Sequence, residues 1–199
     1  MVPNRYRYVA EATNRLLQLA GDGAQVDSRT LAAAATQAEQ ALESLLTDPA
    51  FHALLTSSAA QSALGNADRR ELEEELANLA VSFVRAEAEA LKRLGHSEHE
   101  VQEILWLAAS CKNLSDMPPL SHDALAGKIH NLKVACGRAS AELRKGVDAK
   151  TRKNWLSRLG LGMAGISVMV ADVALFPTSA ATSVVSVSMS TLMIDRSLG

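Results

Sequence analysis

The chain has 199 residues, of which 48% are hydrophobic and only 4% aromatic, and its formal net charge is −2. This length fits one domain, or one domain with an appendage. The N-terminus lacks the continuous apolar region and the cleavage site of a secretory signal peptide, so we expect a cytoplasmic protein. Abundant alanine and leucine, interrupted by only five prolines and 11 glycines, favour helix nearly everywhere.

Helical periodicity in the first quarter predicts two long helices. The first begins at Pro3, places Val9 and other apolar residues inward, and ends at a Gly-Asp-Gly turn. Asp27 or Ser28 can cap the second helix. Its apolar residues share one stripe until Asp48-Pro49, where the residue before proline avoids the helical region. A short helix should follow that break.

The middle of the chain continues the pattern. Asp68 is placed to cap a long helix that stops at Gly95, with an acidic solvent face. Ser97 and Glu100 form the Ser-x-x-Glu capping box of a further helix, which Pro118-Pro119 ends. The next helix stops at a glycine and has the cleanest apolar stripe in the chain: Leu125, Ile129, Leu132, Cys136, Ala139 and Leu143.

Residues 1–147 therefore read as an all-α bundle of about five to six amphipathic helices. Residues 148–199 read as a basic flank followed by a hydrophobic two-helix hairpin. Between positions 159 and 194 the only charged residue is Asp172, and Pro177 forms a hinge between two apolar halves of 18 and 17 residues. At about 1.5 Å per residue each half is roughly 26 Å long, slightly shorter than the ~30 Å hydrocarbon core of a bilayer.

Charge is distributed unevenly along the chain. Residues 1–120 carry 17 acids and 10 bases, whereas residues 121–199 carry 5 acids and 10 bases. A basic helix that leads into an apolar segment favours anionic lipid over nucleic acid, for which no aromatic platform is present. The basic and aromatic residues expected to dock on the membrane are Lys150, Arg152, Lys153, Trp155 and Arg158.

Small residues line both predicted hairpin helices. In lipid they allow close helix contact, and serine hydroxyls bond across it, so we expect a homo-oligomer. Asp172 should face a partner or water, because a carboxylate within a membrane is costly. The predicted packing positions are Gly160, Gly162, Gly165, Ala171, Ser183, Ser186 and Ser190.

No pattern of catalytic, metal-binding or cofactor-binding residues is evident, and we expect a non-enzymatic protein without a cofactor. His96 and His99 are three residues apart at a helix start, a spacing that more often belongs to a solvated helix end than to a metal site. The GLGMAG sequence at residues 160–165 has dinucleotide-site spacing but lacks a preceding strand. The acidic residues 71–75 point around their helix and do not converge.

The sequence thus predicts a membrane-associating protein that acts through its C-terminal hairpin at the inner face of the membrane. An oligomeric pore-forming or membrane-disrupting effector of the toxin or defence type fits this pattern. A protein partner on the bundle is a further expectation. The plan of amphipathic helices around one hydrophobic hairpin is similar to that of colicin-type toxins, although no motif matches. The alternative is a soluble interaction or scaffold module whose hairpin is permanent core or an oligomer interface.

Overall fold

The computed structural model describes residues 4–21, 26–52, 92–93, 95–102, 122–175 and 193–199. Within these ranges every regular element is a helix and no strand occurs, which confirms the all-α prediction. The long helices are α1 (Asn4–Gly21), α2 (Ser28–Leu46), α6 (His122–Arg144) and α7 (Ala149–Leu175). Shorter helical turns lie at residues 49–52, 98–102 and 193–198.

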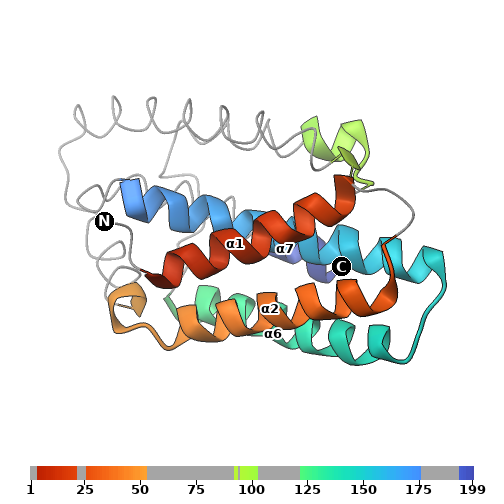
Figure 1. Cartoon of the computed structure of the whole chain (residues 1–199). Coiled ribbons are helices and arrows are strands. Elements are labelled where there is room, and N and C mark those ends of the chain that lie inside the picture. The colour runs from red at the N-terminus through yellow and green to blue at the C-terminus, as the bar shows by residue number, and fades with distance from the viewer. Residues whose placement is uncertain (1–3, 22–25, 53–91, 94, 103–121, 176–192) are drawn as a thin grey trace.

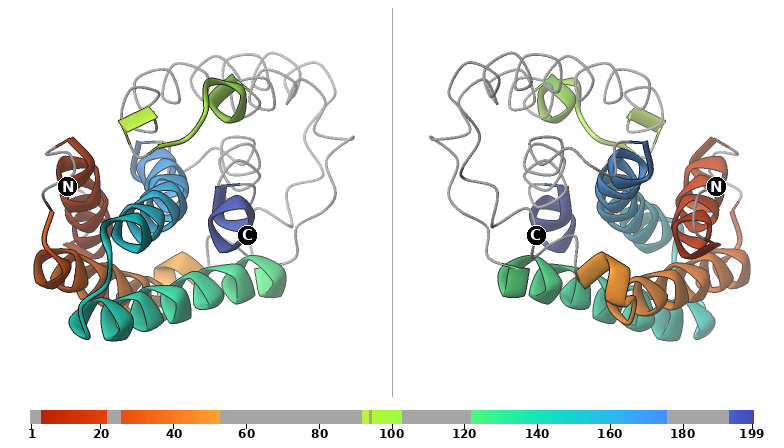
Figure 2. Two further views of the ribbon diagram at one scale, coloured as in Figure 1. Left: turned by 90° about the vertical axis from the view of Figure 1, so that its right-hand side faces the viewer. Right: turned by 90° about the vertical axis from the view of Figure 1, so that its left-hand side faces the viewer.

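The four long helices form two layers (Figures 1 and 2). Helix α2 packs along α6, while α1 packs against both α2 and α7 (Figure 1). In the end-on views of Figure 2, residues 193–198 lie on the other side of α7 from α1, above α6. Helix α7 is therefore enclosed by α1, by α6 and by the turn at 193–198.

The core follows from the apolar periodicity of the sequence. The alanines of α2 are buried beside its leucines. Their small side chains let α1 and α6 each pack closely against α2. Full burial of one leucine stabilises the fold by about 1.5–3 kcal/mol. On the described helices α1, α2 and α6, the apolar positions expected to face inward are buried: Val9, Leu16 and Leu19 on α1, Leu31, Ala35, Ala38, Leu42 and Leu45 on α2, and the six stripe residues of α6.

Several predicted helix ends that lie within the described residues are also observed. Asp27 Oδ1 accepts hydrogen bonds from the amides of Arg29 and Thr30 at 2.8 and 2.9 Å, so Asp27 caps α2. In the capping box before residue 98, the Ser97 amide donates to Glu100 Oε2 at 2.6 Å, and the Glu100 amide donates to Ser97 Oγ at 3.2 Å. Gly146 follows α6 with a φ of +80°, a conformation that favours glycine.

A few polar contacts fix how the helices meet. The buried Thr13 hydroxyl donates to the Val9 carbonyl and to Met163 O on α7, at 2.9 and 3.2 Å. Between α2 and α6, the hydroxyls of Thr36 and Ser140 lie 2.8 Å apart. Because buried polar groups are costly without partners, these pairs favour one register of the helices over slipped alternatives.

The sequence predicts a basic flank followed by two separate apolar helices, and the structure differs from this in the first part of the tail. The basic flank and the first apolar half form a single helix, α7, of 27 residues. Its residues Ala171 and Asp172 are helical, but their side chains fall outside the described structure. The second helix of the predicted hairpin also lies outside the described residues, with its hinge Pro177 and packing residues Ser183, Ser186 and Ser190.

The predicted long helix that begins at Asp68 falls almost wholly outside the described residues. The number of helices in the bundle is therefore not established. Among the described helices, none is both long enough and apolar enough to cross a membrane.

Candidate functional site

The apolar part of α7 is enclosed on all sides for two turns. Every residue from 159 to 166 is buried, whereas a helix on the surface of a bundle exposes part of each turn. Thr13 of α1 bonds to the backbone of this segment at Met163. Leu132 of α6 and Ser197 of the C-terminal turn meet it at Gly162. The predicted hairpin segment is, over these residues, the central helix of the bundle.

Gly162 is the point of closest approach. A Cβ atom placed there would lie 2.6 Å from Leu132 Cδ1 and 2.8 Å from Ser197 Oγ, both closer than real Cβ contacts. A larger residue there requires the side chains of Leu132 and Ser197, or the elements that carry them, to shift. Gly160 and Gly165 are buried as well. Of these predicted packing positions, Gly162 is the one where α6 and the C-terminal turn meet α7.

Three polar residues at the start of this segment hold α7 to three other parts of the chain. We call Trp155, Ser157 and Arg158 the collar. Trp155 Nε1 donates to Glu142 Oε2 of α6 at 3.1 Å. Ser157 meets His96, and Arg158 binds the backbone of the C-terminal turn. Because all three lie within one helical turn, the collar ties α7 down where its apolar segment begins.

The Arg158 contact is the strongest of the three by chemistry. Its Nε donates to Ser197 O at 2.8 Å, and its Nη2 donates to Leu198 O at 2.6 Å. Its guanidinium carbon also lies 5.6 Å from the ring centroid of Trp155, within cation–π range. Charge-assisted bonds of this kind are roughly twice as strong as neutral ones.

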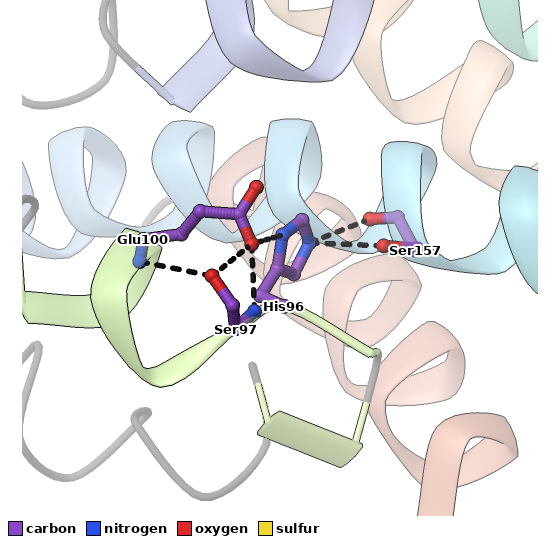
Figure 3. Close-up of polar contacts among 4 residues, drawn as sticks. All are labelled: His96, Ser97, Glu100 and Ser157. Atoms are coloured by element: carbon purple, nitrogen blue, oxygen red, sulfur yellow. Dashed lines mark hydrogen bonds and ion pairs between the residues drawn. The ribbon is translucent and has the colours of Figure 1, made fainter.

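His96 contacts both Ser157 and Glu100 (Figure 3). Its Nε2 lies 3.1 Å from Ser157 Oγ and 3.3 Å from the Ser157 carbonyl oxygen. Its Nδ1 lies 3.9 Å from Glu100 Oε2, a distance for an ion pair but not for a hydrogen bond. The cluster joins residues 95–102 to α7, which come from distant parts of the sequence.

The order carboxylate, histidine, hydroxyl is reminiscent of a catalytic triad, but the chemistry is incomplete. Ser157 lies inside α7, where backbone amides bond along the helix and none is available to stabilise an oxyanion. Glu100 Oε2 is already bonded to the Ser97 amide and hydroxyl, at 2.6 and 2.9 Å. The geometry is that of a structural tie.

Titration of the neighbouring groups agrees with this reading. The pKa of Glu100 lies below its usual range, first because the Ser97 amide donates to it and then because of the Ser97 hydroxyl, with smaller help from His96 and Arg196. At the start of α7 the pKa of Asp148 is lowered by its hydrogen bonds from Thr151. Both carboxylates cap helices.

His99 and Cys136 lie outside the cluster of His96, Glu100 and Ser157. His99, the neighbour of His96 in the predicted helix end, is exposed. Within the described ranges, no group of three or more histidine, cysteine or acidic side chains is arranged to hold a metal ion. Cys136 is buried in the core stripe of α6, and burial raises the pKa of its thiol to about 12.

The five docking residues predicted from the sequence fall into two groups. Lys150 and Lys153 are exposed. Trp155 and Arg158 are partly buried in the collar, and Arg152 is partly buried with its Nη1 donating to Val147 O at 2.8 Å. Of the five predicted docking residues, Lys150 and Lys153 are thus exposed to solvent, while Arg152, Trp155 and Arg158 make contacts within the chain.

The sequence did not predict the contact of His96 with α7, or the roles of Glu142, Ser157 and Ser197. It also did not predict the ion pair between Lys128 and Asp195. The partners in the collar are 13, 61 and 39 residues apart along the chain, so no local motif relates them. Comparison with protein-family models, with curated proteins and with solved structures finds no match to this chain.

Proposed function

We propose that this chain is a membrane-associating protein that shelters an apolar helix in its bundle and delivers it to anionic lipid at the inner face of the membrane. There it acts as an oligomeric pore-forming or membrane-disrupting effector. One observation carries the proposal: α7 joins an exposed basic start to eight consecutive buried residues, 159–166. A segment apolar on all sides can exchange a protein environment for lipid, and an amphipathic helix cannot do so without exposing its polar face to hydrocarbon.

The exposed lysines alone provide weak docking. A lysine near an anionic membrane surface contributes about 1 kcal/mol, so Lys150 and Lys153 together supply roughly 2 kcal/mol, or about thirtyfold in partitioning. Binding of this strength is reversible and falls with ionic strength. Durable attachment therefore needs the apolar segment of α7 to leave the bundle.

Vesicle binding by the full-length protein tests the proposal. The protein should sediment with phosphatidylglycerol vesicles, and Lys150→Gln with Lys153→Gln should lower the partition coefficient about thirtyfold. Arg15→Gln with Arg138→Gln is the matched control, since it removes two exposed cations from other parts of the bundle. If the wild-type protein ignores anionic vesicles, or if the control loses as much binding as the α7 variant, the proposal fails.

A second candidate is an interaction or scaffold module in which α7 stays as permanent core or forms an oligomer interface. The collar favours it, because Trp155 and Arg158 already have partners within the chain. This candidate expects monodisperse protein or a defined oligomer in detergent-free buffer, with no change in size distribution when anionic vesicles are added. Sedimentation velocity with and without vesicles separates the two candidates.

A further inference from the structure

The C-terminal turn at residues 193–198 is held against α7 by buried apolar side chains and by charge. Met193, Ile194 and Ser197 have exposed fractions of 1%, 0% and 2%. Asp195 pairs with Lys128 of α6. Together with the Arg158 contacts, these interactions attach the turn to both helices that border it (Figure 2).

Arg158 satisfies backbone groups that would otherwise lack partners. The last carbonyl groups of a helix receive no hydrogen bond from an amide of the same helix, and they carry its partial negative charge. The guanidinium donates to two of them in succession, at Ser197 and Leu198. A lipid phosphate is recognised through the same forked N–H donors. The turn occupies the Nε–Nη2 edge of the guanidinium, so a phosphate cannot use that forked edge while the turn is in place.

We propose that the C-terminal turn is a clasp that competes with lipid phosphate for Arg158 and holds α7 in the bundle until it opens. This inference rests on the membrane association proposed above and names its regulation. With the clasp closed, only Lys150 and Lys153 of the basic flank are exposed to lipid. Opening it releases the Arg158 guanidinium and uncovers α7 at Gly162 in one event, since Ser197 lies at both contacts.

The close approach at Gly162 provides a way to open the clasp without changing charge. Ser197 is only 2% exposed and faces α7 beside Gly162, so the larger branched side chain of Ser197→Leu should displace the turn from α7. Ser197→Ala is the matched control, because it removes the hydroxyl bond to Ile194 O but adds no bulk. Arg158→Lys is a second opening variant, since a lysine keeps the charge but cannot fork across two carbonyls.

Two measurements on the full-length protein test the clasp. The first is amide hydrogen exchange in buffer without lipid, followed at Gly199, whose amide donates to Asp195 O at 3.1 Å. Both opening variants should speed this exchange by about tenfold or more, the effect expected from losing one bond to a charged group. The second is co-sedimentation with phosphatidylglycerol vesicles, with phosphatidylcholine vesicles as the uncharged reference. Ser197→Leu, which keeps the Arg158 guanidinium, should bind the anionic vesicles more tightly than the wild-type protein and the Ser197→Ala control.

The outcomes separate this inference from the proposed function. Faster exchange together with tighter anionic binding supports the clasp. If the wild-type protein binds anionic vesicles and Ser197→Leu exchanges faster but binds no more tightly, membrane association stands. In that case the competition between the turn and lipid phosphate for Arg158 is refuted. Unchanged exchange in Arg158→Lys overturns the clasp even where Ser197→Leu fails to fold. Absence of anionic binding in every variant overturns the proposed function, and the regulatory role with it.

Discussion

Replacement of Gly162 by alanine tests whether α7 is packed as closely as its burial indicates. Alanine in a helix interior is favoured over glycine by roughly 0.8–1 kcal/mol. Against this gain, the new Cβ would lie 2.6 Å from Leu132 Cδ1 and 2.8 Å from Ser197 Oγ. Overpacking of a well-filled core costs about 1–3 kcal/mol. We therefore expect Gly162→Ala to lower the free energy of unfolding by about 0–2 kcal/mol.

Gly127→Ala on α6 is the matched control, because it makes the same chemical change with nothing within 4 Å of the new Cβ. It should stabilise the fold by roughly 0.8–1 kcal/mol. The difference between the two variants, measured by urea unfolding followed by circular dichroism, isolates the packing cost at Gly162. Leu132→Ala removes one of the clashing atoms, so Gly162→Ala should cost less in that background. Equal stabilisation by both glycine variants would refute the close packing of α7 against α6 and the clasp.

Three further predictions concern chemistry at single residues. With a pKa of about 12, the Cys136 thiol at pH 8 is ionised in roughly one molecule in 10,000, against about a quarter for an ordinary thiol. Iodoacetamide should therefore label it at least about a thousandfold more slowly in the folded protein than in urea, as read by mass spectrometry. Because the folded pKa of Glu100 is lowered, its stabilising contribution is present above its unfolded value near 4.5 and is lost as pH falls through the folded pKa. The protection factor of the Val101 amide should fall in acid, and Glu100→Gln should remove that dependence. If Asp172 lines a pore, Asp172→Asn should change the ion selectivity of dye and ion leakage from vesicles, and unchanged selectivity would remove that role.

The parts of the fold that the sequence predicts correctly depend on local signals. The stripe on α6 is buried at every predicted position, because a 3.6-residue period places those side chains on one face whatever the rest of the chain does. Asp27 and the Ser97–Glu100 capping box are found where expected, since each satisfies helix amides only two or three residues away. Elements and their ends can be predicted because their causes lie within a few residues.

The collar could not be predicted for the opposite reason. Trp155 and Arg158 carry the same chemistry whether they anchor at a lipid interface or donate within a bundle, so residue type alone does not distinguish the two uses. Their partners are Glu142 and the carbonyl groups of residues 197 and 198. Backbone carbonyls have no signature in a sequence, and only the path of the chain brings them to Arg158. The contacts of Trp155 and Arg158 within the bundle could therefore be found only from the structure.

The division of the basic flank has a consequence for how strongly α7 is retained. Lys150 and Lys153 precede the collar and remain exposed, so an anionic surface attracts the start of α7 without breaking any described contact. The collar and the burial of residues 159–166 oppose further movement, and burial of the leucines at 159 and 161 alone stabilises the bundle by about 3–6 kcal/mol. Under the proposed function, hydrocarbon offers those same side chains a comparable apolar environment, so the polar ties, and not the apolar segment, would oppose the exchange. Loss of the clasp, the Ser157–His96 contact or the Trp155–Glu142 bond should therefore promote membrane association more than any change of hydrophobicity between residues 159 and 166.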